Sequence, residues 1–125
     1  MTDLDLQHVL NVSVAAAREA GALLMDGFGK SKVINRKSSA VDWVTQFDTA
    51  AEALLGDRLR TAFPDHNFVG EEGFSAEGSL PYTWYIDPLD GTTNFAHGFP
   101  VFCVSLGLWE GNRPLLGVVY DHCPG

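Results

Sequence analysis

The first part of the chain has apolar residues at helical spacing. They form one stripe over Leu4–Met25, and Asp3 stands where a helix-capping residue is expected. Gly27 and Gly29 then break the stripe, because glycine readily takes the left-handed conformation that ends many helices. We therefore expect a first helix that ends before Gly27, followed by a short extended segment, Val33–Arg36.

A second helix is predicted after another extended run. Val41–Thr45 is expected to be extended and follows the polar turn Lys37–Ser39. Next, Thr49 and Glu52 fit a capping box, in which a hydroxyl and a carboxylate satisfy free backbone amides reciprocally. We therefore expect the helix to begin at Thr49 and to stop at Pro64, because proline ends a helical pattern.

Short strands separated by polar loops are predicted for the rest of the chain. Gly73–Pro81, rich in glycine and serine, is expected to be a surface loop, and Glu110–Pro114 has the residues of a hairpin turn. This order of elements favours an α+β fold, a single domain over residues 1–125 with two helices packed on one face of a largely antiparallel sheet. The expected strands are Phe68–Gly70, Tyr82–Ile86, Val101–Trp109 and Leu115–Tyr120.

Charge and composition narrow the classes of partner. The net charge is −8, from 16 acidic against 8 basic residues, so the average surface would repel a nucleic-acid backbone. No apolar stretch is long enough to cross a bilayer, and two cysteines without a C-x-x-C spacing suit a reducing cytosol. We expect a cytoplasmic protein without a nucleic-acid or membrane partner. An acidic chain that binds a phosphate ester needs a cation between the two, which directs attention to its carboxylates.

The most informative segment is Trp84–Phe95, with the sequence W-Y-I-D-P-L-D-G-T-T-N-F. Pro88 fixes one backbone torsion and Gly91 permits a tight bend after the strand. The carboxylates of Asp87 and Asp90 can then be held toward one point beyond the strand end. Hard divalent cations prefer such an arrangement of oxygen ligands.

Donors for a phosphate group follow the second carboxylate directly. The backbone amides and hydroxyls of Gly91, Thr92 and Thr93 would bind phosphate beside the metal. For an isolated D-x-x-D pattern, a capped turn would be the better explanation, with Asp87 and Asp90 bonded to local amides. The complete string is far harder to produce by chance, which favours a shared metal and phosphate site.

Further carboxylates stand upstream in less specific settings. Glu71 and Glu72 lie between two glycines at a strand end, where a cation or solvent must relieve their repulsion. Solvent is the ordinary explanation for an isolated pair, and the second acidic cluster reverses that preference. Considered alone, Asp48 would be a helix-capping residue and Lys37 a solvated surface lysine. Asp42 precedes the expected second helix, and the four histidines show no metal-ligand spacing.

Taken together, these motifs resemble those of the inositol monophosphatase family. D-P-L-D-G-T-T-N-F fits the family signature D-P-x-D-G-T-x-N-F, G-E-E fits its upstream acidic motif, and Lys37–Asp48 is similar to its hairpin. The order and spacing of the three motifs agree over nearly the entire chain. The resemblance implies the N-terminal half of the layered αβαβα sandwich of inositol monophosphatases and fructose bisphosphatases. It also implies Mg²⁺-dependent hydrolysis of a small polyol or sugar phosphate monoester, with inositol monophosphate as the default substrate.

The resemblance implies a role for each matching residue. Glu72, Asp42 and Lys37 would support the site, and Asp48 and Thr92 would orient and activate the attacking water without a covalent intermediate. The implied metal ligands are Glu71, Asp87, Asp90 and the main-chain carbonyl of Leu89, the catalytic residues are Asp48, Glu71 and Thr92, and the substrate-binding residues are Asp90, Gly91, Thr92 and Thr93.

A later family motif, W-D-x-x-A, does not occur in this chain. In the family it supplies another metal ligand and most substrate-selecting contacts, so the resemblance implies weak or no turnover for these 125 residues and an uncovered apolar sheet face that favours self-association or instability. Fructose bisphosphate, histidinol phosphate and phosphoadenosine phosphate stay open as substrates.

An alternative, non-enzymatic hypothesis is a truncated, inactive metal-binding or subunit-interaction module. A calcium buffer is disfavoured, because the EF-hand pattern is absent. Dimerisation is usual in the family, so a homodimer is compatible with the resemblance, while the residues leave the oligomeric state open.

Overall fold

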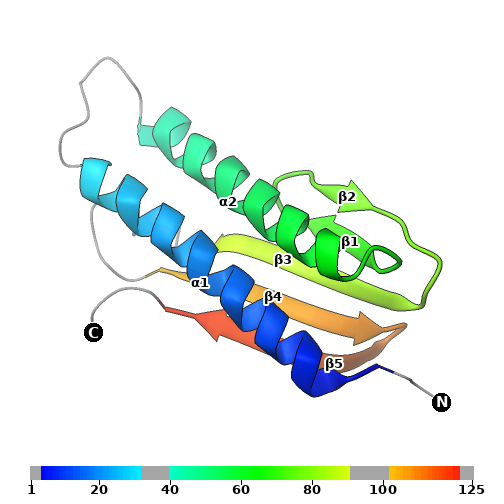
Figure 1. Ribbon diagram of the computed structural model, residues 1–125. Coiled ribbons are helices and arrows are strands. Elements are labelled where there is room, and N and C mark those ends of the chain that lie inside the picture. The colour runs from blue at the N-terminus through cyan, green and yellow to red at the C-terminus, as the bar shows by residue number, and fades with distance from the viewer. Residues whose placement is uncertain (1–3, 32–39, 91–101, 122–125) are drawn as a thin grey trace.

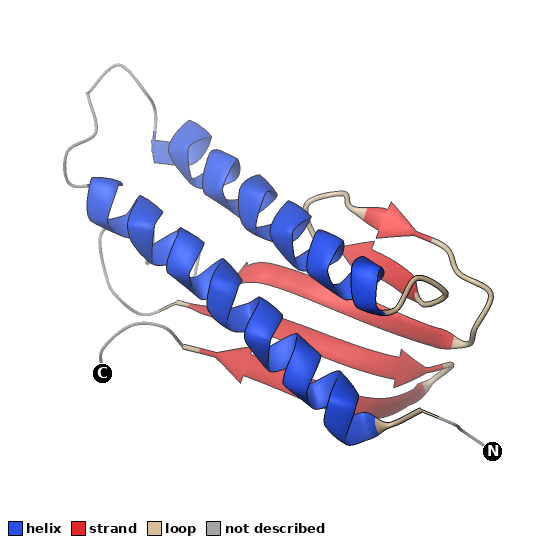
Figure 2. Cartoon of the chain, in the orientation of Figure 1, coloured by secondary structure: helices blue, strands red, loops and turns tan. Residues whose placement is uncertain are grey.

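Two helices and five strands form the described part of the computed structural model, residues 4–31, 40–90 and 102–121. Both helices lie along the same face of the sheet, as expected (Figures 1 and 2). In these residues, neither helix is long and apolar enough to cross a membrane. The elements are α1 (Leu6–Ser31), α2 (Ala40–Ala62), β1 (Asn67–Gly70), β2 (Ser75–Ala76), β3 (Tyr82–Asp90), β4 (Cys103–Glu110) and β5 (Arg113–Tyr120).

The sheet is mixed, with the strand order β2-β1-β3-β4-β5. β1 pairs with β3 in parallel, and the other neighbours pair antiparallel, so the expected largely antiparallel sheet is confirmed. The segment Gly73–Pro81 was expected to be a loop, and it also contains the two-residue strand β2. This strand returns along β1 within the connection 71–81 that leads to β3. The parallel pairing brings the ends of β1 and β3 to the same edge of the fold.

The N-terminal cap of α1 is Asp5. Its Oδ1 atom accepts hydrogen bonds from the backbone amides of Gln7 (3.1 Å) and His8 (3.2 Å), which satisfies two otherwise free donors of the first turn. The expected cap, Asp3, lies outside the described residues.

The predicted end of α1 before Gly27 is wrong, because the helix continues to Ser31. Gly27 is buried, and a Cβ atom there would come within 2.4 Å of the Phe47 ring of α2. This glycine therefore permits the close approach of the two helices rather than a helix end. Tertiary packing outweighs the modest helix penalty of one glycine.

The predicted start of α2 at Thr49 is also wrong. The helix begins at Ala40, so Val41–Thr45 is helical, and the predicted hairpin over 37–48 is helical from residue 40 onward. Its apolar stripe already includes Phe47 and continues through Ala51, which places Thr49 inside the helix. β-branched residues lower helix propensity only slightly, so a packed helix overrides them. The predicted stop at Pro64 is confirmed; Val33–Arg36 and Lys37–Ser39 lie outside the described residues.

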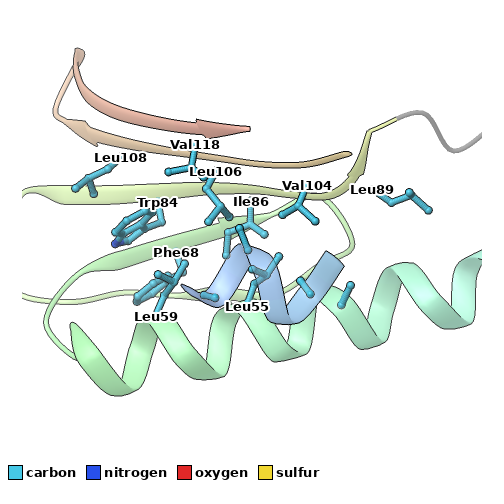
Figure 3. Packing of buried hydrophobic residues seen from close by; sticks show 14 of the residues in the cluster. Leu55, Leu59, Phe68, Trp84, Ile86, Leu89, Val104, Leu106, Leu108 and Val118 are labelled. Carbon is cyan, nitrogen blue, oxygen red and sulfur yellow. The ribbon is translucent and has the colours of Figure 1, made fainter. Parts of the chain in front are cut away.

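The core lies between the two helices and the sheet. Trp84, Leu55 and Leu59 are each 0% exposed, and Figure 3 shows the two leucines of α2 facing Phe68 and Ile86 of the sheet. Burying a side chain of this size stabilises a fold by about 1.5–3 kcal/mol relative to leaving it in water. This packing fixes α2 against β1 and β3.

The predicted hairpin near the end of the chain is confirmed. β4 and β5 pair antiparallel around Gly111 and Asn112, and Gly111 has a φ of 59°, a left-handed conformation that favours glycine. The predicted strands 101–109 and 115–120 agree with β4 and β5, except that residue 101 lies outside the described residues.

The opposite face of the sheet carries exposed apolar side chains. Val69, Tyr85 and Val119 are 47%, 48% and 72% exposed. In the strand register Val69 pairs with Tyr85, Tyr85 with Gly107, and Gly107 with Gly117. Exposed apolar area of this kind supports contact with another surface. The self-association expected from the sequence stays a prediction.

His66 is a core residue in this fold and accepts a hydrogen bond as a neutral ring. It is 3% exposed, and Trp84 donates from Nε1 to its Nδ1 atom at 3.0 Å. Phe63 stacks on it at a centroid distance of 4.9 Å. Burial lowers the pKa of His66 below its ordinary value of 6.5, against the opposing charge of Asp65.

We predict that His66 destabilises the fold in acid. Because its pKa is lowered on folding, the unfolded chain binds the proton more readily, so stability present above pH 6.5 is lost as the pH falls below that value. His66→Asn keeps an acceptor oxygen and removes the titration. Between pH 7.5 and 5.5, urea unfolding should show a change in stability that is less favourable for the wild type than for this variant; equal changes would contradict the assignment.

Candidate active site

An acidic turn, residues 71–73, joins β1 to β2. Gly70 donates to the carbonyl of Phe74 at 2.7 Å and closes the turn, and Gly73 takes a φ of 103°, which glycine allows. Glu71 and Glu72 occupy the two positions before this glycine, and both side chains are exposed. A three-residue hairpin loop commonly combines a turn with such a left-handed glycine. The local sequence therefore presents two carboxylates at the end of β1.

Glu52 of α2 binds the backbone of this turn. It is 2% exposed, and its two carboxylate oxygens accept from the amides of Glu72 (2.8 Å) and Phe74 (2.9 Å). The predicted capping-box role of Glu52 is therefore wrong, because this residue lies inside the helix. Sequence reasoning missed its function, although its place four residues after Asp48 puts both carboxylates on one side of α2.

Asp48 is a buried carboxyl one turn earlier in α2. It is 6% exposed, and within the described residues its Oδ1 atom has no hydrogen-bond partner. Burial raises its pKa from 3.8 to about 7, and the Glu72 side chain, through its charge and a hydrogen bond, adds to the rise, followed by the charges of Asp87 and Glu71. The helix-capping alternative for Asp48 is excluded, because α2 begins eight residues before it.

Asp87 and Asp90 lie in β3 rather than in a turn beyond it. The expected strand end at Ile86 is wrong, since β3 continues to Asp90. The register with β4 shifts between Asp87, opposite Ser105, and Asp90, opposite Cys103, so β3 contains one extra residue there. A bulge of this kind bends a strand and redirects its side chains, and Pro88 cannot donate to the ladder.

Asp87 meets the acidic turn directly. It is half-buried, and burial raises its pKa from 3.8 to about 6, with hydrogen bonding to Glu71 and the charge of Glu71 as the next causes. The amide of Leu89 donates to Asp87 Oδ1 at 3.3 Å and lowers the pKa, while the charge of Asp90 raises it. Asp87 and Glu71 are therefore brought together from two parallel strands.

Cys103 is a neighbour of Asp90 that sequence reasoning did not identify. Its Sγ atom lies 3.9 Å from Asp90 Oδ2, across the β3–β4 pair. Burial, followed by the charge of Asp90, raises the pKa of this thiol above 9.0. The protonated thiol donates to the carboxylate. The pairing of the two strands would have been needed to find it.

A hollow of about 380 Å³ opens beside these carboxylates on the face of the sheet away from the helices. Glu71, Asp87 and Tyr85 are among the residues that line it. The complete lining is Val69, Gly70, Glu71, Tyr85, Ile86, Asp87, Ser105, Leu106 and Gly107.

The structure brings some predicted site residues together and leaves others outside its description. Asp48 contacts Glu72, and Asp87 contacts Glu71, but in the described ranges no three acidic, histidine or cysteine side chains surround one point as a finished metal centre. Asp42 lies in α2, without a description of its side chain. The predicted residues Lys37, Gly91, Thr92 and Thr93 lie outside the described residues.

The donor set suits a hard divalent cation. Burial and the neighbouring carboxylates raise the pKa values of Asp48 and Asp87, and a buried Asp48 oxygen has no protein partner in the described region. Oxygen ligands of this kind are those that Mg²⁺ prefers, and an opposite charge would remove their repulsion. The residues present therefore fit the metal that the sequence implies.

Comparison with known proteins gives concordant matches. A model of the inositol monophosphatase family matches residues 5–124. The chain is 47% identical over 120 residues to inositol monophosphatase 1 of Solanum lycopersicum, covering 93% of this chain and 44% of that protein. It is 43% identical over 118 residues to a protein of Aquifex aeolicus named fructose-1,6-bisphosphatase/inositol-1-monophosphatase, covering 93% and 44%.

The fold agrees with a solved relative as well. The structure of inositol monophosphatase from Anabaena matches with a TM-score of 0.78 at 38% identity, over 95% of this chain and 42% of that one. The chain thus spans less than half the length of these relatives. The family model covers nearly all of it. The chain belongs to the inositol monophosphatase family.

Proposed function

We propose that this chain carries the metal-binding part of an enzyme that hydrolyses small phosphate monoesters with Mg²⁺, inositol monophosphate first among them. The observation that supports it is the convergence of Asp48, Glu71, Glu72 and Asp87, in which burial and mutual contacts raise the pKa values of both aspartates. A phosphate ester and a cluster of carboxylates repel each other unless a cation lies between them.

In this proposal Glu71, Asp87, Asp90 and the carbonyl of Leu89 hold the metal. When bound, Mg²⁺ lowers the pKa of a water molecule and neutralises charge on the phosphate and leaving oxygens. The acidic turn would hold Glu71, and the bulge in β3 would orient Asp87 and Asp90, before a cation binds. Glu72, in the acidic turn, contacts Asp48 through a side-chain hydrogen bond and would keep it in position.

Asp48 is proposed as the group that accepts the proton of the attacking water. A general base is most effective when its pKa lies near the working pH, and burial brings the pKa of Asp48 to about 7. The hydroxyl of Thr92 would orient that water, and the amides and hydroxyls of Gly91, Thr92 and Thr93 would hold the phosphate. Asp90 would continue toward the substrate hydroxyls, and Lys37 and Asp42 would support the site.

The choice of substrate rests on names of relatives. The Solanum lycopersicum relative is named an inositol monophosphatase, whereas the Aquifex aeolicus name pairs that activity with fructose-1,6-bisphosphatase. Both point to a phosphorylated small polyol or sugar, and inositol monophosphate is common to the two names.

The direct test is phosphate release by the full-length protein with Mg²⁺. Inositol monophosphate, fructose bisphosphate, histidinol phosphate and phosphoadenosine phosphate form the panel, and we expect the highest kcat/KM for the first. Asp48→Asn should lower the rate roughly 100-fold or more, because it removes the proton acceptor. Glu77→Gln is the matched control, since Glu77 is exposed and follows β2, toward the end of β1 opposite the acidic turn.

Two outcomes would contradict this proposal. Mg²⁺ binding without hydrolysis of any ester would favour an inactive metal-binding module instead. An Asp48→Asn rate equal to that of Glu77→Gln would remove Asp48 from the mechanism.

A second prediction concerns stability without divalent cations. Because folding raises the pKa of Asp48 from 3.8 to about 7, the unfolded chain ionises first, and stability falls as the pH rises from about 4 to about 7. The loss is on the order of 4 kcal/mol for a shift of that size. Asp48→Asn should therefore be more stable than the wild type at pH 8 and lose less stability over this range.

Urea unfolding of the two proteins at pH 5 and pH 8, with EDTA and then with Mg²⁺, measures this effect. Saturating Mg²⁺ should recover most of the wild-type loss and little for Asp48→Asn. A wild-type stability that is the same at pH 5 and pH 8, with and without Mg²⁺, would contradict the prediction.

A further inference from the structure

We propose that Glu52 is a positioning residue that fixes the acidic turn in the shape required for cation binding. It would not touch the cation or the substrate; it would act through the backbone of Glu72 and Phe74. This inference rests on the proposed function for the identity of the ligand, a divalent cation. Its geometric part concerns the described residues of α2, β1 and β2.

Every backbone amide from Glu71 to Phe74 has an acceptor, and Glu52 supplies two of these four acceptors. Glu71 donates to the carbonyl of Ile86 at 3.1 Å, and Gly73 donates to that of Gly70 at 3.3 Å. The remaining two amides, of Glu72 and Phe74, donate to Oε1 and Oε2 of Glu52. A carboxylate is the side chain that offers two acceptor oxygens and no donor at this spacing.

The Glu52 carboxylate occupies the space that a side chain at position 70 of β1 would fill. A Cβ atom on Gly70 would lie 2.4 Å from Glu52 Cδ and 2.5 Å from Oε1. Glycine at position 70 and glutamate at position 52 are therefore complementary in space. A glutamate that caps a helix or is exposed to solvent would not require a glycine at the neighbouring position.

The next turn of α2 holds the same segment through apolar contact. Gly56 follows Glu52 by four residues, and a Cβ atom there would lie 2.6 Å from the Phe74 ring. Phe74 in turn packs edge-on against Phe68 at a centroid distance of 6.1 Å. The turn is thus held to α2 at two adjacent levels, by hydrogen bonds at Glu52 and by ring contact at Gly56.

The consequence concerns the side chains of the turn. Asp48, one helical turn before Glu52, contacts the Glu72 carboxylate, and Glu52 holds the Glu72 amide. One face of α2 therefore sets both the backbone and the side chain of Glu72. Glu71 is the preceding residue and meets Asp87, so a shift of the turn would move a proposed metal ligand.

The test compares Glu52→Gln with two matched variants. Glutamine has nearly the same size, but its amide group would face one of the two donor amides, so one hydrogen bond is lost. Leu59→Val weakens the same helix in the core away from the turn, and Glu77→Gln removes an exposed charge. Circular dichroism and thermal unfolding establish that each variant is folded at the assay temperature.

Two readouts are measured on the folded proteins without any turnover. Mn²⁺ binding by calorimetry should weaken about 10-fold to 100-fold in Glu52→Gln, the usual effect of losing a residue that orients metal ligands. Both control variants should bind as the wild type does. In the absence of metal, hydrogen exchange by NMR should accelerate at least about tenfold at the amides of Glu72 and Phe74, and much less at Glu71, whose acceptor belongs to β3.

A double-variant comparison isolates the spatial match. Gly70→Ala should be strongly destabilising in the wild type and much less so together with Glu52→Ala, because the carboxylate no longer occupies the space of the new methyl group. Equal effects in the two backgrounds would overturn the complementarity of these residues.

The outcomes separate this inference from the proposed function. If Glu52→Gln accelerates exchange but binds Mn²⁺ like the wild type, Glu52 is structural and the inference fails. If exchange at Glu72 and Phe74 does not change, the inference fails at its first step. If the wild type binds no Mn²⁺, the proposed function fails together with the role toward a cation, whereas the exchange data still decide whether Glu52 fixes the turn.

Discussion

The mutual repulsion of carboxylates at one end of the sheet is the constraint on which the rest of this structure depends. α2 contributes Asp48 and Glu52, the acidic turn contributes Glu71 and Glu72, and β3 contributes Asp87. Bringing such groups out of water favours their protonated forms, and this is the main reason that the pKa values of Asp48 and Asp87 rise. Glu52 has amide donors for both oxygens, whereas in the described residues Asp48 retains a buried oxygen without a partner.

An apolar core holds these charges in place. Leu55 and Leu59 pack on Phe68 and Trp84, so α2 cannot move away from β1 and β3 without exposing the centre of the fold (Figure 3). Close approach of the helix to its neighbours also depends on missing side chains, as Gly70 shows at the Glu52 carboxylate. The packing of the apolar core therefore keeps the carboxylates close together despite their mutual repulsion. A cation that relieves the repulsion would stabilise the fold through the same contacts.

The sequence predicted the fold class and most strands because their patterns are local. The alternating strand β4, the Gly111 turn and the stop at Pro64 each depend on a few neighbouring residues. The errors involve contacts over long sequence separations. Gly27 has the local sequence of a helix end, but it packs beside Phe47 of the other helix. Glu52 fits a capping box locally, but it lies in the interior of α2 and bonds to the turn.

In the candidate site, too, local sequence predicted some features and long-range contacts determine the others. The acidic motifs indicated which carboxylates to examine, and the contacts of Glu71 with Asp87 and of Glu72 with Asp48 agree with that choice. The bulge in β3, the neighbouring thiol of Cys103 and the support from Glu52 come from strand register and helix packing. No local pattern contains that information.

The central claim is that these carboxylates form one electrostatic unit built for a cation, and NMR titration of the Asp48 and Asp87 carboxyl carbons tests it most directly. Without divalent cations, the account predicts pKa values of about 7 and about 6, both of which fall when saturating Mg²⁺ is added. Titration of both groups near 3.8, unchanged by Mg²⁺, would contradict it.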